Sequence, residues 1–216
     1  MKLSIHKVHY PVMTLGYGRR VGIWLQGCSI KCPDCINKDT WPEDNQCDIE
    51  VDKLMPSLRK WLENADGVTV SGGEPLDQPH ALASLLQRLR KACSGDILLY
   101  TGYERQVVFR RFANIATLSD VLVTGPYKHD AGCNLMLRGS DNQEVILLSD
   151  IARSRYPADI NSRPWPEIRQ LDIVVGHNVA WMAGIPKTNE LARLKRKLTR
   201  YGLKCAVSDK KATARS

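Results

Sequence analysis

The chain has 216 residues, 43% of them hydrophobic, and carries 31 Lys and Arg against 23 Asp and Glu, for a formal net charge of +8. That length favours one globular domain with a sizeable core and a small appendage, and the absence of a long apolar run excludes a membrane-spanning protein. The basic surplus favours an anionic partner, such as a phosphate or an acidic protein surface.

The first part of the chain predicts two strands joined by a turn. An imperfect alternation of apolar and polar residues over 3–12 indicates an irregular first strand or arm. The glycines at 16–18 indicate a turn. Residues 21–25 then predict a short buried strand, which delivers the chain to Gly27.

Three cysteines follow directly, in the spacing C-x3-C-x2-C: Cys28, Cys32 and Cys35. Thiolates at this spacing can hold three irons of a 4Fe-4S cluster from one compact loop. The next cysteine, Cys47, lies twelve positions beyond Cys35. The fourth iron is therefore expected to stay open to another ligand.

Zinc and disulfides are alternative uses of the cysteines. A zinc site usually pairs two knuckles, and none follows Cys35 at finger spacing. Disulfides need an oxidising compartment, whereas residues 1–12 interleave charges and histidines with apolar residues, unlike a signal peptide. We therefore expect reduced thiols in a cytoplasmic protein.

Four further cysteines occur singly in the chain: Cys47, Cys93, Cys133 and Cys205. We interpret them as small apolar residues and not as ligands of a second cluster.

The middle of the chain alternates helices and strands. Asp48 is a plausible helix N-cap, and the regular part of that helix is predicted to begin near Leu54, with Pro56 in its first turn. Further helices are predicted over 82–89 and 104–115, and buried strands over 67–71, 97–101 and 121–124. This alternation predicts an α/β fold with a parallel sheet and right-handed crossovers.

Four further motifs accompany the cysteine loop. They are Ser71-Gly72-Gly73-Glu74-Pro75 and Tyr100-Thr101-Gly102-Tyr103, each at the end of a predicted strand, and the runs DVLVTGPY at 120–127 and RGSDNQ at 138–143. Together with GCSIKCPDCINKDTW at 27–41, they resemble the activating proteins of anaerobic ribonucleotide reductases, within the radical S-adenosylmethionine superfamily. The matches run from about residue 16 to 146, and the chain after 149 has no recognised counterpart.

The resemblance implies a partial (β/α) barrel of the radical S-adenosylmethionine type, with a core domain over 1–150 and a C-terminal extension over 151–216. It implies that Cys28, Cys32 and Cys35 ligate a 4Fe-4S cluster. S-adenosylmethionine would bind the open iron and be cleaved reductively to methionine and a 5′-deoxyadenosyl radical. The implied cofactor contacts are Asp34, Ile36, Ser71, Gly72, Gly73, Glu74 and Thr101, and no catalytic residue is assigned.

The glycines and the acid of this set have a physical rationale. Gly72 and Gly73 would let backbone carbonyls approach the ammonium group of the cofactor, and Glu74 would receive or orient a cation. Two residues of the cysteine loop depart from the family's usual pattern: Ile30, where a histidine is common, and Asp34, where a small or aromatic residue is common. Neither departure removes a cluster ligand.

The C-terminal part has its own elements. The Pro, Arg and Asn content of 153–166 predicts a linker across the surface. Residues 171–175 and 179–182 predict a hairpin around Gly176-His177-Asn178. The spacing of Leu191, Leu194 and Leu198 predicts an amphipathic helix, which either packs on the core with a solvated basic face or docks an acidic partner or a phosphate. Its basic residues are Arg193, Lys195, Arg196, Lys197 and Arg200.

Three functions are compatible with these features. The first is an activating enzyme that passes its radical to a glycine of a large partner, such as an anaerobic ribonucleotide reductase, with electrons from a low-potential donor such as flavodoxin or ferredoxin. The second is a radical enzyme for a peptide, nucleotide or small metabolite. The third is a non-catalytic iron–sulfur electron carrier or sensor. No membrane is expected, and nucleic acid is a less favoured partner.

The cysteine assignment makes a direct prediction. Cys28→Ala, Cys32→Ala and Cys35→Ala should each abolish the cluster, because three thiolates are the fewest that the open-iron arrangement allows. Iron and sulfide analysis of anaerobically reconstituted protein measures this loss. Cys47→Ala and Cys205→Ala are the controls and should keep full iron content; loss of about half the iron in either would reveal a second cluster.

Overall fold

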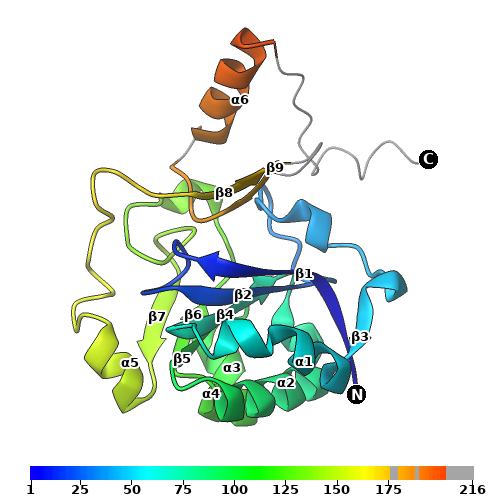
Figure 1. Cartoon of the computed structure of the whole chain (residues 1–216). Coiled ribbons are helices and arrows are strands. Elements are labelled where there is room, and N and C mark those ends of the chain that lie inside the picture. Colours follow the sequence, from blue (N-terminus) through cyan, green and yellow to red (C-terminus); the bar gives the residue numbers. More distant parts are fainter. Residues whose placement is uncertain (176–179, 188–189, 203–216) are drawn as a thin grey trace.

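A seven-stranded sheet forms the centre of the computed structural model, which describes residues 1–175, 180–187 and 190–202 (Figure 1). The strands in this sheet are β1 (Lys2–Val12), β2 (Arg20–Leu25), β3 (Asp48–Glu50), β4 (Gly67–Gly72), β5 (Asp96–Tyr100), β6 (Val121–Thr124) and β7 (Glu144–Leu147). They lie in the order β3-β1-β2-β4-β5-β6-β7.

The four central strands of the sheet are parallel. β2 pairs with β4, β4 with β5 and β5 with β6 in parallel register, while β1, β3 and β7 pair antiparallel at the two edges. The α/β fold with a parallel sheet that the strand and helix alternation predicted is confirmed in these central strands. The antiparallel edge strands β3 and β7 were not predicted. The partial barrel stays a prediction.

Helices cover one face of the sheet (Figure 1). They are α1 (Val51–Leu62), α2 (Pro79–Ala92), α3 (Arg105–Arg111) and α4 (Ala113–Leu118). Alternate residues of a strand point to opposite faces, so Ile97 and Leu99 of β5 pack in the core beneath the helices, whereas Leu98 packs in a second cluster on the other face. Both clusters consist mainly of buried aliphatic side chains.

The chain after β7 contributes to the core on that other face. Helix α5 (Asp150–Arg155) is followed by Tyr156 and Ile160, which are 2% and 1% exposed and pack with Leu98 of β5. The prediction of a surface linker over 153–166 was therefore wrong in its first half. The Pro and Arg content of that segment concealed two apolar side chains that the sheet buries.

Two predicted helices differ from those observed. α1 begins at Val51, so Pro56 lies in its interior, not in its first turn. The backbone N–H of Val51 donates to the carbonyl of Met1, and the burial of Val51 and other residues along one face outweighs the hydrogen bond that proline cannot make. The helix predicted over 104–115 is broken at Phe112 into α3 and α4.

The C-terminal elements are a strand pair and a helix. β8 (Asp172–Val175) pairs antiparallel with β9 (Ala180–Ala183), and Trp181 of β9 packs edge-on against Trp24 of β2. The predicted turn at 176–178 and Cys205 lie outside the described residues. α6 (Glu190–Arg200) has no buried residue among those described and projects from the body (Figure 1), so it is not observed to pack on the core.

The length and polarity of the helices bear on the membrane prediction. Among the described residues, no helix is both long enough and apolar enough to cross a bilayer.

A buried ion pair joins the amino-terminal ends of the parallel strands. Arg20 of β2 donates to both carboxylate oxygens of Asp96 of β5, at 3.0 and 2.8 Å, and both side chains are 0% exposed. Arg20 also donates to Thr69, while Tyr156 donates to Asp96 at 2.9 Å and Arg155 forms a second ion pair with it. Such a pair is retained only because its polar atoms are satisfied.

Asp96→Ala should lower the free energy of unfolding by about 3–5 kcal/mol, because it leaves the Arg20 guanidinium buried without its counter-charge. Urea denaturation measures the change. Glu144→Gln is the matched control: it breaks the Arg105–Glu144 pair, whose side chains are 55% and 41% exposed, and should cost no more than about 1 kcal/mol. Equal losses in the two variants would contradict the role given to Asp96.

Candidate functional site

The predicted site residues follow the carboxyl ends of the parallel strands. β2 leads into the cysteine loop at 27–41, β4 into Gly73 and Glu74, and β5 into Thr101. Ligands of open α/β sheets bind outside this edge, where successive loops meet. The fold therefore brings together three motifs that lie far apart in the sequence.

The two glycines of the Gly-Gly-Glu motif touch the chain itself. A Cβ atom on Gly72, whose φ is +107°, would lie 2.3 Å from the backbone nitrogen of Leu25. A Cβ on Gly73 would lie 2.0 Å from the carbonyl oxygen of Gly27. Glycine is required at both positions because two backbones approach each other too closely for a side chain. This is a different reason from the predicted approach to the cofactor's ammonium group, which stays a prediction.

Backbone hydrogen bonds close the cysteine loop at its base. Gly27 donates to the carbonyl of Thr40 at 2.8 Å, and the next N–H donates to the carbonyl of Trp41 at 3.2 Å. Gln26, which the sequence did not single out, is 5% exposed and donates to the carbonyl of Pro42 at 2.7 Å. These hydrogen bonds hold the two ends of the cysteine loop together, next to the end of β2.

The three cysteines are half-buried on this loop. Burial raises the pKa of the Cys28 thiol, against which the backbone N–H groups of Lys31 and Ile30 act. Burial likewise raises the pKa of Cys35, the N–H of Asn37 lowers it, and the charges of Cys32 and Cys28 raise it further. The sulfur of Cys35 accepts that N–H at 3.4 Å.

This donor set fits an iron–sulfur cluster. The sulfurs influence one another electrostatically, so deprotonating all three needs a compensating positive charge, which bound iron supplies. Backbone N–H groups directed at the sulfurs are a recognised influence on cluster potentials. Within the described ranges, no three His, Cys, Asp or Glu side chains are close enough to hold a single metal ion. A cluster instead places each thiolate on a separate iron.

Glu74 and Thr101 meet in the structure. Glu74 is 1% exposed and accepts hydrogen bonds from the Thr101 hydroxyl at 2.7 Å, the Gly102 N–H at 2.8 Å and the Leu76 N–H at 2.9 Å. Burial raises the pKa of Glu74 to about 7, although these donors favour the carboxylate. The acid is therefore less readily ionised than an exposed glutamate, and a cation beside it would favour its ionised form.

The remaining predicted cofactor contacts differ in their exposure. Asp34 and Ile36 are exposed, and Asp34 has a φ of +57°, in the left-handed region that aspartate tolerates better than most residues. The unusual Ile30 faces Gly102, where a Cβ would lie 2.6 Å from its Cδ1 atom. Ser71 is the penultimate residue of β4 and half-buried.

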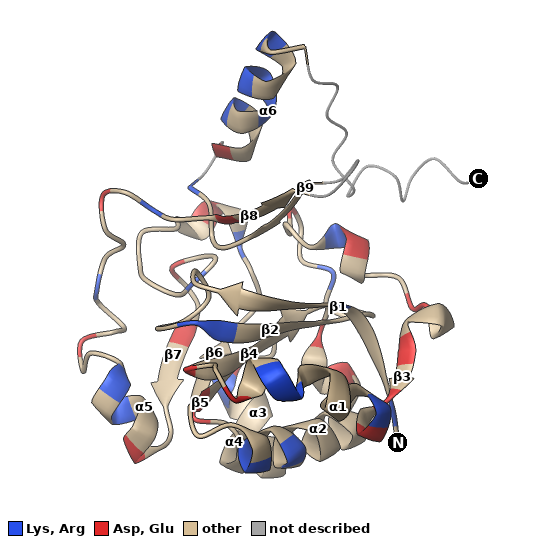
Figure 2. Ribbon diagram, viewed as in Figure 1, with Lys and Arg blue, Asp and Glu red and all other residues tan. Residues whose placement is uncertain are grey.

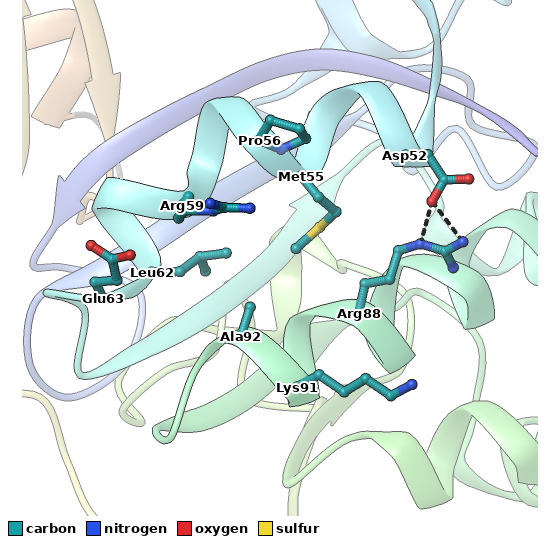
Figure 3. Close-up of a pocket in the computed structure, with 9 residues that line it drawn as sticks. All are labelled: Asp52, Met55, Pro56, Arg59, Leu62, Glu63, Arg88, Lys91 and Ala92. Carbon is teal, nitrogen blue, oxygen red and sulfur yellow. Dashed lines mark hydrogen bonds and ion pairs between the residues drawn. The ribbon is translucent and has the colours of Figure 1, made fainter.

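A groove of about 600 Å³ lies elsewhere, between α1 and α2 (Figure 3). Met55 and Leu62 line it together with the ion-paired Asp52 and Arg88. None of the predicted site residues is among its lining residues, so the groove is separate from the site at the strand ends.

Comparison with known proteins identifies the family of the chain. Residues 14–146 match the family model described as a 4Fe-4S single cluster domain, which makes the chain an iron–sulfur protein. It is 32% identical over 145 residues to the anaerobic ribonucleoside-triphosphate reductase-activating protein of Escherichia coli K12, covering 63% of this chain and 94% of that one. It is 33% identical over 103 residues to the pyruvate formate-lyase-activating enzyme of Clostridium pasteurianum, covering 46% and 43%.

The chain therefore belongs to the radical S-adenosylmethionine activating proteins. Its cofactors are a 4Fe-4S cluster and S-adenosylmethionine. Among solved structures, QueE from Escherichia coli aligns with a TM-score of 0.41 and 22% identity over 47% of this chain and 53% of that one, a likeness too slight to carry an argument.

The Gly73 contact changes what a substitution there should do. Gly73→Ala should displace the cysteine loop and lower the free energy of unfolding by about 1–3 kcal/mol, because its Cβ has no space against Gly27. Iron content and S-adenosylmethionine affinity should fall together, as measured on reconstituted protein.

Gly139→Ala is the control, because the nearest neighbour of its Cβ would be the Tyr127 side chain at 3.3 Å, which a small shift of that ring relieves, and no backbone atom would lie within 3 Å. A Gly73→Ala protein with full iron and normal stability that failed only to bind S-adenosylmethionine would show that the space belongs to the cofactor, as the sequence first suggested.

Proposed function

We propose that this protein is an activating enzyme that cleaves S-adenosylmethionine reductively and installs a glycyl radical on a large partner enzyme, such as an anaerobic ribonucleotide reductase. The observation that carries the proposal is the seating of the cysteine loop against Gly73, at the edge where Glu74 and Thr101 also lie. The activating proteins among the relatives support the same function.

The roles of the residues follow from their contacts. Cys28, Cys32 and Cys35 would hold the cluster, which when bound supplies the electron that cleaves the cofactor. Glu74 would hold the ammonium group of S-adenosylmethionine, since three donors fix its carboxylate and a cation would stabilise its ionised form. Asp34, Ile36, Ser71, Gly72 and Thr101 would complete the cofactor's surroundings. The chain's contribution is binding and orientation.

The C-terminal extension is the best candidate for a partner-specific element. Lys and Arg residues line the exposed helix α6 (Figure 2), which favours an acidic partner surface. The division at residue 150 separates the matched core from this extension, although α5 and Tyr156 pack on the core. A partial barrel around the site and a flavodoxin or ferredoxin as electron donor complete the proposal.

The decisive experiment is a coupled assay under strict anaerobiosis with a strong reductant. Reconstituted protein should release 5′-deoxyadenosine from S-adenosylmethionine, measured by chromatography. With the anaerobic ribonucleotide reductase of the same organism present, it should produce a glycyl radical doublet by electron paramagnetic resonance. Cys32→Ala should abolish both signals, because it removes a cluster ligand.

The outcomes separate the three functions. Release of 5′-deoxyadenosine with no glycyl radical on any glycyl-radical enzyme of that organism would favour a small-substrate or peptide enzyme. A loaded and reducible cluster that yields no 5′-deoxyadenosine would leave the electron carrier or sensor.

A further inference from the structure

Asp77 contacts the cysteine loop, although the sequence marks it in no way. It ends a short 3-10 helix (Pro75–Asp77) that follows the Gly-Gly-Glu motif. One carboxylate oxygen accepts the backbone N–H of Ser29 at 2.7 Å, and the other accepts the Ser29 hydroxyl at 2.8 Å. Ser29 directly follows Cys28, so this carboxylate holds the segment between the first two cysteines.

Tyr103 extends the contact to the next strand. Its hydroxyl donates to the same carboxylate at 3.2 Å, and its backbone N–H donates to the Thr101 hydroxyl oxygen at 3.1 Å. Thr101 in turn donates to Glu74, whose N–H donates to the carbonyl of Gly27 at 2.9 Å. Hydrogen bonds to Gly27 and Ser29 thus grip the loop on both sides of Cys28.

The contact between Asp77 and Ser29 orders the cysteine loop and is not part of the hydrophobic core. Asp77 is exposed and is not a member of the hydrophobic core between the sheet and its helices, so water could solvate this carboxylate if it had no partner. Its donors instead come from the loop and from the end of β5, and hydrogen bonds to an ionised acceptor are about twice as strong as neutral ones. Because the carboxylate accepts both the backbone N–H and the hydroxyl of Ser29, its charge lies one residue from Cys28 along the chain.

We propose that Asp77 is a positioning residue for the cluster. It holds the segment from Cys28 to Cys32 against the end of β4 and places a negative charge beside the first ligand. This role rests on the proposed function only in that a cluster occupies the loop. Every contact in the tether is made by protein groups, so the tether itself requires no bound metal.

The tether can be tested without any cofactor. In metal-free protein, Asp77→Ala should accelerate hydrogen exchange of the Ser29 amide at least about tenfold, since a hydrogen bond to a charged group contributes about 1.5–3 kcal/mol and tenfold corresponds to about 1.4 kcal/mol. Asp77→Asn should protect the amide at an intermediate level, because its amide oxygen can still accept the N–H. An unchanged exchange rate in Asp77→Ala would overturn the proposal.

The charge can be tested on reconstituted protein. Asp77→Asn and Asp77→Ala should both shift the cluster's reduction potential to more positive values, because a nearby negative charge disfavours the added electron. Redox titration followed by electron paramagnetic resonance measures the shift. Asp52→Asn removes the same charge from α1, away from the loop, and should leave the potential and the Ser29 exchange as in wild type.

The results separate this proposal from the proposed function. An unchanged potential in both Asp77 variants would overturn the charge role, even with wild-type activity. Equal shifts in the Asp52→Asn control would also overturn it, because they would indicate a general effect of net charge. A protein that loads its cluster and shows the predicted shifts, but generates no radical on a partner, would support Asp77 while contradicting the activating function.

Discussion

The close approach of Gly73 to Gly27 is the constraint on which the site depends. The backbone leaving β4 touches the backbone leaving β2, with no room for a side chain between them. The Glu74 N–H then bonds to the Gly27 carbonyl, so the first residue of the cysteine loop and the start of the acidic motif share one hydrogen bond. Because β2 and β4 are parallel neighbours, their carboxyl ends must meet, and glycine lets them meet closely.

Charge is arranged differently at the two ends of the parallel strands. At the amino ends, Arg20 and Asp96 form a fully buried pair, to which Arg155, Tyr156, Thr69 and backbone carbonyls add further partners. At the carboxyl ends, Glu74 is buried with hydrogen-bond donors as its partners, and burial raises its pKa to about 7. The amino ends of the strands thus hold a paired charge that stabilises the fold. The carboxyl ends hold an acid whose ionised form a bound cation would stabilise.

The segments after β7 contact the parallel strands at both their amino and their carboxyl ends. Tyr156 and Arg155 reach Asp96 at the amino ends, while Trp181 packs on Trp24 of β2. The face of the sheet opposite the helices is therefore covered in part by the C-terminal region. α6 stands apart from this packing, with its basic residues exposed (Figure 2). Because α6 buries no side chain among the described residues, substitutions on it would leave the core unchanged.

Local patterns were sufficient to predict the central elements and the candidate ligands. Strand β6 was predicted at its observed bounds from a short apolar run, and Cys28, Cys32 and Cys35 were recognised because their chemistry depends on spacing within one loop. Pairings between distant residues could not be predicted in this way. Arg20 and Asp96 lie 76 residues apart, and Ser29 and Asp77 lie 48 apart. The sequence alone determined which residues could bind a cluster and which segments could be strands, because these depend on neighbouring residues. Only the tertiary structure decided which carboxylate holds the loop and why Gly73 is a glycine, because both depend on the distance between strands that the sequence does not encode locally.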